Sequence, residues 1–422
     1  MSGLLAARVL SDFYSEVIIL ERDNLLNDGR HRRGVPQSRH AHGLLAGGRE
    51  VLDDLFPGIS EELIDAGAIS ADVVNDGKWF FEGDCLRRAP SGTNGILLSR
   101  PLLEGTIRRR VRTLERISVR DNCSVRDLIM VNGLVKGIQT ETGMLEADLV
   151  VDASGRGSQS ARWLKSLGFP PPREEEVEVR LTYTTRIFRR RKTDMGGDAF
   201  ASIPVTLENK RSGVILAQED DRWVVTLIGR FGIEAPEDLE GYRNYAKQLA
   251  APYIYDVIRD AEPIGDATVM RFPASVRRRY EELSRFPDGF LIFGDAICSF
   301  NPVYGQGMSV AALQAKALQD ELAKGGINVA SRFFRAASKL IDVPWNIAVG
   351  SDLRMPETVG TRTLGGKVMG WYISKLHRFA HRDADAALAF LRVAQLLDDP
   401  SSLMRPELVF RVLTGKIKPQ AA

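Results

Sequence analysis

The sequence is poor in the residues that build disulfide and metal sites. In 422 residues there are five histidines and three cysteines, which are Cys85, Cys123 and Cys298. The cysteines lie far apart and form no CxxC pair, which argues against a disulfide framework and against structural zinc. His31, His40 and His42 have no thiols or paired carboxylates near them in the sequence. We therefore predict no metal centre.

Long apolar runs and an excess of one charge are also missing. No run approaches the roughly 18 residues of a membrane-spanning helix, and the first residues form an amphipathic pattern instead of a signal peptide. Lys and Arg number 57 against 55 Asp and Glu, a net charge of +2, which gives no drive toward nucleic acid. With 44% hydrophobic and 27% charged residues, we expect a globular cytoplasmic protein without a transmembrane segment and without a nucleic-acid partner.

Motifs of hydrolytic catalysis are absent. No GxSxG motif occurs, which disfavours an α/β-hydrolase. His377 and His381 stand four apart on an expected helix, a spacing that metal ligands use, but no Glu follows His377 and arginines flank both residues. We therefore predict that this pair lies on a solvated helix face.

The order of patterns along the chain is that of an α/β protein interrupted by a β-rich part. Helical spacing at the N-terminus is followed by the short strand Glu16–Leu20, and a meander with turns at Asn132-Gly133 and Thr142-Gly143 occupies residues 116–151. Alternating strands dominate 170–285. The strand Phe290–Phe293 restores the α/β pattern, and the C-terminal third is helical.

The strongest local signal follows that restored strand. The strand ends in Asp295, which is placed to bind a polyol hydroxyl. Gly305 and Gly307 then allow the backbone to approach a flat ligand. A helix of about 16 residues begins near Met308, and its positive end stabilises negative charge on a bound ring.

A weaker signal lies at the N-terminus. A dinucleotide-binding fold has a glycine turn, a helix and then a strand that ends in an acid about 20 residues later. Gly3 and Glu21 fit the end of this pattern. A complete unit takes about 30 residues, so we expect that the first strand and the leading glycines are missing and that the sequence begins at an internal methionine of the reading frame.

Together these segments resemble FAD-dependent monooxygenases of the glutathione-reductase-like fold, which include relatives of p-hydroxybenzoate hydroxylase and of squalene epoxidase. The resemblance is carried by Glu21, Ser99-Arg100, Asp152–Ser158 and Gly294–Gly307. The block Arg32–His42 looks closest to bacterial polyene epoxidases of polyether biosynthesis. The later Arg271–Pro273, Arg278–Tyr280 and Pro344-Trp345 fit that subgroup as well.

The resemblance implies a division of the chain and a set of cofactor-binding residues. The expected parts are an FAD-binding domain in residues 1–67, 99–169 and 286–345, a β-sheet substrate domain in 68–98 and 170–285, and C-terminal helices in 346–422. The residues implied to bind FAD are Gly3, Glu21, Arg32, Gln37, His40, Arg100, Asp295, Pro302, Gly305, Gly307 and Met308.

The resemblance also implies the reaction. Reduced FAD and dioxygen form a hydroperoxide on the flavin, which transfers one oxygen atom to an apolar unsaturated substrate, by epoxidation first and aromatic hydroxylation second. The hydroxylases carry an Asp-Gly pair linked to NADPH use where this chain has Ser154-Gly155. NADPH or a separate flavin reductase is therefore expected to supply the electrons.

Other interpretations stay open at this stage. One alternative is an FAD-dependent prenyl-chain reductase of the geranylgeranyl reductase kind, and another is a truncated, cofactor-free, inactive chain. No side-chain nucleophile is expected, and Pro302 and Tyr183 are candidates to line the substrate pocket. For the apolar stretch Ala384–Leu397, packing on the body is favoured over a lid or an interfacial contact.

Overall fold

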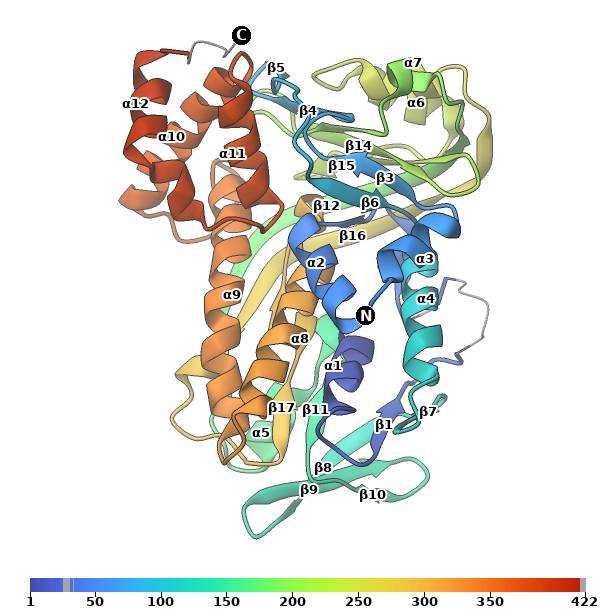
Figure 1. Cartoon of the computed structure of the whole chain (residues 1–422), viewed down its shortest axis with the longest axis vertical. Coiled ribbons are helices and arrows are strands. Elements are labelled where there is room, and N and C mark those ends of the chain that lie inside the picture. Colours follow the sequence, from blue (N-terminus) through green and yellow to red (C-terminus); the bar gives the residue numbers. More distant parts are fainter. Residues whose placement is uncertain (26–30, 33, 418–422) are drawn as a thin grey trace.

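The computed structural model describes residues 1–25, 31–32 and 34–417, and Figure 1 shows their arrangement. Parallel strands and their helices form the lower half of the view. A large sheet, antiparallel except for the pair β13 (Phe200–Ile203) and β4 (Gly77–Phe81), crosses the upper half, and the C-terminal helices stand beside it at the upper left.

The parallel strands of the lower half form two separate pairs among the described residues. In one pair β1 (Val17–Leu20) lies beside β7 (Ile117–Arg120), and in the other β11 (Val150–Asp152) lies beside β17 (Phe290–Ile292). Every residue of β17 is buried, as expected for a parallel strand covered on both faces. An α/β fold with an interrupted parallel sheet was predicted from the sequence.

Seven helices among the described residues surround these pairs. They are α1 (Ser2–Leu10), α2 (Ala46–Leu55), α3 (Ile59–Asp65), α4 (Arg100–Arg112), α5 (Ser160–Ser166), α8 (Gly307–Ala323) and α9 (Val329–Asp352). Helix α8 contacts α1, α2 and α9. Small residues permit this packing, because a Cβ atom on Gly48 of α2 would lie 2.6 Å from Ser309 of α8. The predicted helix near Met308 is confirmed.

A meander closes the lower end of the molecule (Figure 1). It consists of β8 (Val125–Val131), β9 (Leu134–Thr140) and β10 (Met144–Glu146), all antiparallel. The predicted turn at Asn132-Gly133 is confirmed, since both residues have positive φ, 52° and 82°, as a two-residue hairpin turn requires.

The upper half is built on one eight-stranded sheet. Its order is β18 (Cys298–Ser299), β16 (Pro263–Arg279), β12 (Arg173–Arg189), β15 (Arg222–Arg230), β14 (Arg211–Gln218), β13 (Phe200–Ile203), β4 (Gly77–Phe81) and β5 (Asp84–Cys85). A smaller sheet is formed by β2 (Gly43–Leu44), β6 (Asn94–Leu97) and β3 (Ile69–Asp72).

The two faces of the large sheet have different neighbours. Ile215 and Ala217 of β14 are fully buried in the core that contains α6 (Leu239–Lys247) and α7 (Tyr253–Ile258). Val214 and Leu216, which alternate with them, line a cavity on the other side. The sheet therefore separates a packed core from a hollow interior.

Helices α10 (Leu364–Ala380), α11 (Ala384–Ala394) and α12 (Pro406–Thr414) form a core of their own at the C-terminal end. Helix α9 leads into them, and the division proposed at residue 345 falls inside that helix. Leu391 and Val393 of α11 are buried. Among the described residues no helix combines the length and the hydropathy needed to cross a bilayer.

Candidate active site

A cavity of about 1880 Å³ lies between the parallel strands, the large sheet and the C-terminal helices. It brings together most of the side chains singled out in the sequence, although they come from distant segments. Those that line it are Gln37, His40, Arg100, Tyr183, Asp295, Pro302, Gly305, Gly307 and Met308. These residues therefore share one cavity, and their roles toward a cofactor stay a prediction.

Asp295 occupies the short turn directly after the buried strand β17. Gly294 has φ +71°, and a Cβ atom there would lie 2.3 Å from Ser2, so the turn requires glycine. No hydrogen bond from the described residues reaches the Asp295 carboxylate, and burial raises its pKa although Arg100 and Arg156 act in the opposite direction. A desolvated carboxylate without partners is suited to accept hydrogen bonds from a ligand's hydroxyls.

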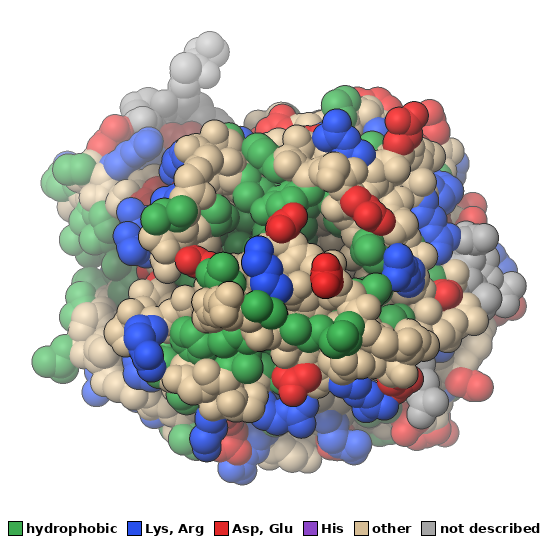
Figure 2. Space-filling model, turned by 90° about the horizontal axis from the view of Figure 1, so that it is seen from below, with side chains coloured by type: hydrophobic (Ala, Val, Ile, Leu, Met, Phe, Trp, Pro, Cys, Tyr) green, Lys and Arg blue, Asp and Glu red, His purple; other side chains and the backbone are tan. Residues whose placement is uncertain are grey.

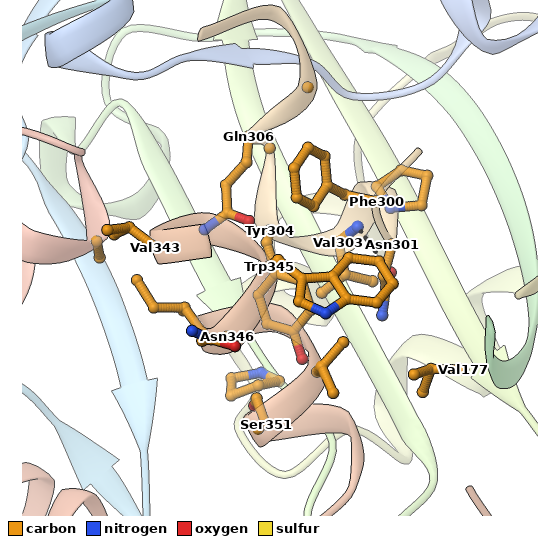
Figure 3. Close-up of a pocket in the computed structure, with 18 of the residues that line it drawn as sticks. Val177, Phe300, Asn301, Val303, Tyr304, Gln306, Val343, Trp345, Asn346 and Ser351 are labelled. Carbon is orange, nitrogen blue, oxygen red and sulfur yellow. Dashed lines mark hydrogen bonds between the residues drawn. The ribbon is translucent and has the colours of Figure 1, made fainter. Parts of the chain in front are cut away.

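The loop from Phe300 to Gln306 leads from this turn to α8. The Asn301 side chain accepts a hydrogen bond from the Val303 amide at 3.1 Å, and Gly305 adopts φ +66°. Figure 3 shows Phe300, Tyr304 and Gln306 of this loop around one pocket with Trp345 of α9.

Helix α8 opens toward the cavity. Its cap residue Gln306 makes no side-chain capping bond, and Gly307 and Met308 line the cavity. The first amides of a helix have no partner within it, and together with the helix dipole they favour an anionic or electron-rich group. A Cβ atom on Gly307 would lie 3.8 Å from Asp295 Oδ1, an ordinary contact, so the protein's own packing does not require glycine there.

His40 joins the N-terminal loop to the large sheet. Its Nδ1 lies 2.8 Å from Thr185 Oγ1, and Thr185 Oγ1 lies 2.7 Å from Thr226 Oγ1. Thr226 also accepts a hydrogen bond from the Ala41 amide at 3.0 Å. Burial is the main reason that the pKa of His40 falls to about 4, so the imidazole is neutral near pH 7.

His42 and Arg100 form the next contact along the wall. His42 Nδ1 donates to the His40 carbonyl at 2.8 Å, which leaves Nε2 to accept from Arg100 Nη1 at 3.3 Å. Burial lowers the pKa of His42 to about 3. The second Arg100 nitrogen donates to Glu104 at 3.1 Å. Arg100 is thus a fixed cation at the cavity wall.

A buried polar network holds the loop from behind. Asp352, at the end of α9, accepts hydrogen bonds from Asn301 Nδ2 at 3.0 Å and from the Tyr304 hydroxyl at 2.9 Å. It also pairs with Arg230 of β15 at 2.9 Å. The Tyr183 hydroxyl donates to Asn301 Oδ1 at 3.2 Å. Helix α9 and strands β15 and β12 therefore meet at this loop.

The Ser154-Gly155 segment forms a compact turn of its own. Asp152 at the end of β11 accepts hydrogen bonds from the Ser154 hydroxyl at 2.5 Å and the Ser158 hydroxyl at 2.6 Å, and from Ser160. Gly155 has φ +80°. These contacts position the turn beside Asp295, whose Cβ would lie 4.0 Å from a Cβ atom on Gly155.

Three of the predicted cofactor residues, Gly3, Glu21 and Arg32, do not line the cavity. Gly3 lies in α1 beside Ala153. Glu21 follows β1, and its carboxylate accepts from Arg32 Nη1 at 2.8 Å. Arg33, which belongs to the block Arg32–His42, lies outside the described residues.

The structure corrects one prediction and adds residues that the sequence did not indicate. His377 is 5% exposed and lies between the rings of Phe81 and Phe390, so the prediction of a solvated face is wrong for it. Arg230 and Asp352 were not identified, because a charge at the end of a strand or helix usually faces water. Within the described ranges no group of three or more His, Cys, Asp or Glu side chains is placed to hold a metal ion.

Comparison with known proteins places this geometry in a structural class. No family model matches the chain. Protein Rv3254 of Mycobacterium tuberculosis is 33% identical over 448 residues, which cover 99% of this chain and 92% of that protein.

Solved structures agree on the fold. The flavin-dependent brominase Bmp2 superposes with a TM-score of 0.67 at 14% identity, covering 98% of this chain and 95% of its own. PqsL, a probable FAD-dependent monooxygenase from Pseudomonas aeruginosa, gives 0.63 at 16% identity and 82% and 91% coverage. The predicted fold class is confirmed: a flavoprotein-type α/β domain interleaved with a β-sheet domain. The chain belongs to the family of Protein Rv3254 of Mycobacterium tuberculosis.

Proposed function

We propose that this protein is an FAD-dependent monooxygenase that adds one oxygen atom of dioxygen to an apolar, unsaturated substrate. The observation that carries the proposal is the juxtaposition of a half-buried carboxylate without a hydrogen-bond partner, Asp295, with the open N-terminus of α8 in a cavity that continues into an apolar chamber. Flavoproteins of the same fold support it.

The residues present fit an FAD molecule. Asp295 would accept hydrogen bonds from the ribityl hydroxyls, and the amides of Gly307 and Met308 would face the electron-rich edge of the ring. Arg100 would hold the phosphate and ribityl region. When bound, FAD supplies the two-electron chemistry and the activation of dioxygen.

The chamber beyond this site favours an apolar substrate. Its walls include Phe200, Ile203 and Val214 of the large sheet and Trp345 of α9. Such walls exclude water, which protects a reactive oxygen donor from wasteful decay. His40, neutral at pH 7 because of its lowered pKa, places no charge beside the substrate.

The reaction requires two electrons and two protons besides dioxygen, since the second oxygen atom leaves as water. We assign their supply to NADPH or to a separate flavin reductase. Ser154 stands in the position where the hydroxylases that use NADPH carry an aspartate. Its amide and its hydroxyl both donate to Asp152. A separate reductase is the arrangement that this substitution favours.

Of the two reactions within this proposal, we favour epoxidation of a polyene or isoprenoid over aromatic hydroxylation. The preference rests on the resemblance of Arg32–His42 and Asn301–Gly307 to polyene epoxidases. An aromatic substrate of similar polarity would meet the same walls, so the product must distinguish the two.

The test is a reaction with isotopically labelled dioxygen. The FAD-loaded protein, a flavin reductase and NADPH are incubated with farnesol as an apolar polyene probe, and products are analysed by mass spectrometry. One labelled oxygen atom in an epoxide is expected. A product of the same yield without oxygen, carrying two added hydrogens, would overturn the proposal in favour of a prenyl-chain reductase.

A further inference from the structure

Exposed apolar side chains concentrate in the C-terminal helices. Among the described residues sixteen large hydrophobic side chains are exposed, and nine of these lie between residues 359 and 417, about one seventh of the chain. On α10, Leu364, Val368 and Trp371 are 81%, 66% and 54% exposed. Their i, i+4, i+7 spacing places them on one face of the helix.

Helix α12 continues this surface. Phe410 and Leu413 are 56% and 50% exposed and stand three residues apart on one face of the helix. Ile417, 50% exposed, follows shortly after the helix ends. The two helices are in contact and lie at the same edge of the molecule (Figure 1). Figure 2 shows green side chains along the left edge, and further green side chains around the central hollow, with charges of both signs between them. Soluble monomers rarely expose such a surface without a partner.

Positive charge accompanies the apolar stripes. Residues 359–417 contain nine Lys and Arg and five Asp and Glu, a net charge of +4, whereas the whole chain carries +2. Lys375 Nζ lies 5.2 Å from the centre of the Trp371 ring, and Lys416 Nζ lies 5.6 Å from that of Phe410. An aromatic ring under an ammonium group suits the boundary between acyl chains and anionic headgroups.

Helix α10 also borders the cavity. Met369 and Trp371 are 44% and 54% exposed and also line the cavity, as do Gly370 and Ile373 between and beyond them. The exposed stripe of α10 is therefore continuous with the wall of the chamber. An apolar molecule that left a bilayer at this stripe would enter the chamber without crossing water.

We propose that α10 and α12 dock this protein on the surface of a bilayer that contains anionic lipid, and that the substrate enters along α10. The docking is independent of flavin chemistry, whereas the entry route rests on the proposed function. We prefer a lipid surface to a second copy of this chain as the partner. In a dimer through this surface, the positive charges beside the apolar stripes of the two copies would face each other.

The test is sedimentation of the FAD-incubated protein with vesicles of phosphatidylcholine that contain about one third phosphatidylglycerol. The stripe variant carries Leu364→Ser, Val368→Ser and Trp371→Ser. A matched control carries Val131→Ser, Leu134→Ser and Met144→Ser, at exposed apolar positions of the meander. A charge variant carries Lys367→Glu and Lys375→Glu, and its control carries Lys165→Glu and Lys339→Glu.

The wild type is expected to sediment with the vesicles, and the stripe and charge variants to bind at least about tenfold more weakly, while both controls match the wild type. Circular dichroism of all variants verifies folding. Failure of the wild type to bind, or equal binding by the stripe variant, would overturn the proposal. So would a wild-type dimer that the stripe variant dissociates, since the stripe would then belong to a second copy. Flavin content is measured in parallel, so loss of FAD and loss of docking are distinguished.

Discussion

Arg230 of β15 and Asp352 of α9 form an ion pair of 2.9 Å in which the side chains are 3% and 0% exposed. Two other nitrogens of Arg230, Nε and Nη1, are buried and have no hydrogen-bond partner in the described part of the chain. The pair lies behind the loop that carries Asn301 and Tyr304. It therefore connects the large sheet and the last long helix to the proposed flavin loop.

Removing one member of this pair should be far more costly than removing an exposed pair. Asp352→Asn leaves the Arg230 guanidinium buried without its counter-charge, and we expect a loss of about 3–5 kcal/mol in the free energy of unfolding. Asp320→Asn, which breaks an exposed contact with Lys316, should cost less than about 1 kcal/mol. Urea denaturation measures both.

A double variant separates charge from packing. Arg230→Met combined with Asp352→Asn contains no unpaired guanidinium, so it should be more stable than Asp352→Asn alone. Equal stability of the single and double variants would contradict the role assigned to the ion pair.

The ionised Asp295 carboxylate should lower the folding stability of the apoprotein, although it strengthens ligand binding. Burial raises its pKa in the folded chain, so the ionised carboxylate destabilises the apoprotein at neutral pH. That penalty is absent below the ordinary pKa of an aspartate, about 4. Asp295→Asn should therefore raise the melting temperature of the apoprotein at pH 7, with a smaller gain as the pH falls toward 4.

The same substitution should weaken FAD binding. Loss of charged hydrogen bonds to ribityl hydroxyls is worth about 1.5–3 kcal/mol, which corresponds to about a tenfold to a hundredfold rise in Kd. Quenching of flavin fluorescence measures it, with Asp320→Asn as the control. A variant that binds FAD as the wild type does would remove Asp295 from the site.

A substitution at Gly307 tests independently whether the flavin ring lies against the N-terminus of α8. Alanine there meets only an ordinary contact with Asp295 and favours a helix, so Gly307→Ala should leave apoprotein stability equal or about 0.5–1 kcal/mol higher. The added methyl group enters the space between α8 and the proposed ring, and FAD affinity should fall. Unchanged affinity, measured by the same fluorescence titration, would place the ring elsewhere.

His377 should make the protein sensitive to acid. Burial between Phe81 and Phe390 lowers its pKa to about 3, whereas the unfolded chain binds a proton below about pH 6.5. Burial of His377 therefore costs no free energy of unfolding above pH 6.5, and the free energy of unfolding declines as the pH falls toward 3. At pH 5 the penalty is about 2 kcal/mol.

His377→Phe removes that penalty and keeps an aromatic ring in place. The variant should lose less stability than the wild type between pH 7 and pH 5, by about 2 kcal/mol. His381→Phe, at a half-buried position that contacts the Phe81 carbonyl, serves as the comparison. Parallel pH profiles for wild type and His377→Phe would refute the burial argument.

The turn at Asp295 and the helix after it were predictable because they follow from local pattern. A buried strand that ends in Asp295, two glycines and a long helix specify a turn, a close backbone approach and a helix terminus without knowledge of the rest of the chain. Helix α8 begins where this pattern places it, and Asp295 and Gly307 both line the cavity, whereas Arg100 was named only through the family resemblance.

Contacts between distant elements were not predictable. Arg230 and Asp352 meet only because β15 and α9 cross behind the loop, and nothing near either residue in the sequence indicates this. The error at His377 has a similar origin: helical spacing shows that two residues share a face, but Phe81 and Phe390 decide which part of that face is covered. The exposed hydrophobic residues of α10, which are Leu364, Val368, Met369 and Trp371, likewise follow an apolar pattern that resembles a packed helix.

The central claim is that FAD binds between Asp295 and the N-terminus of α8. The most direct measurement is the visible absorbance of the purified 422-residue chain after incubation with FAD and removal of free flavin by gel filtration. We predict a flavin spectrum at one FAD per chain for the wild type and its loss in Asp295→Ala. A wild-type protein that stays colourless would contradict the account.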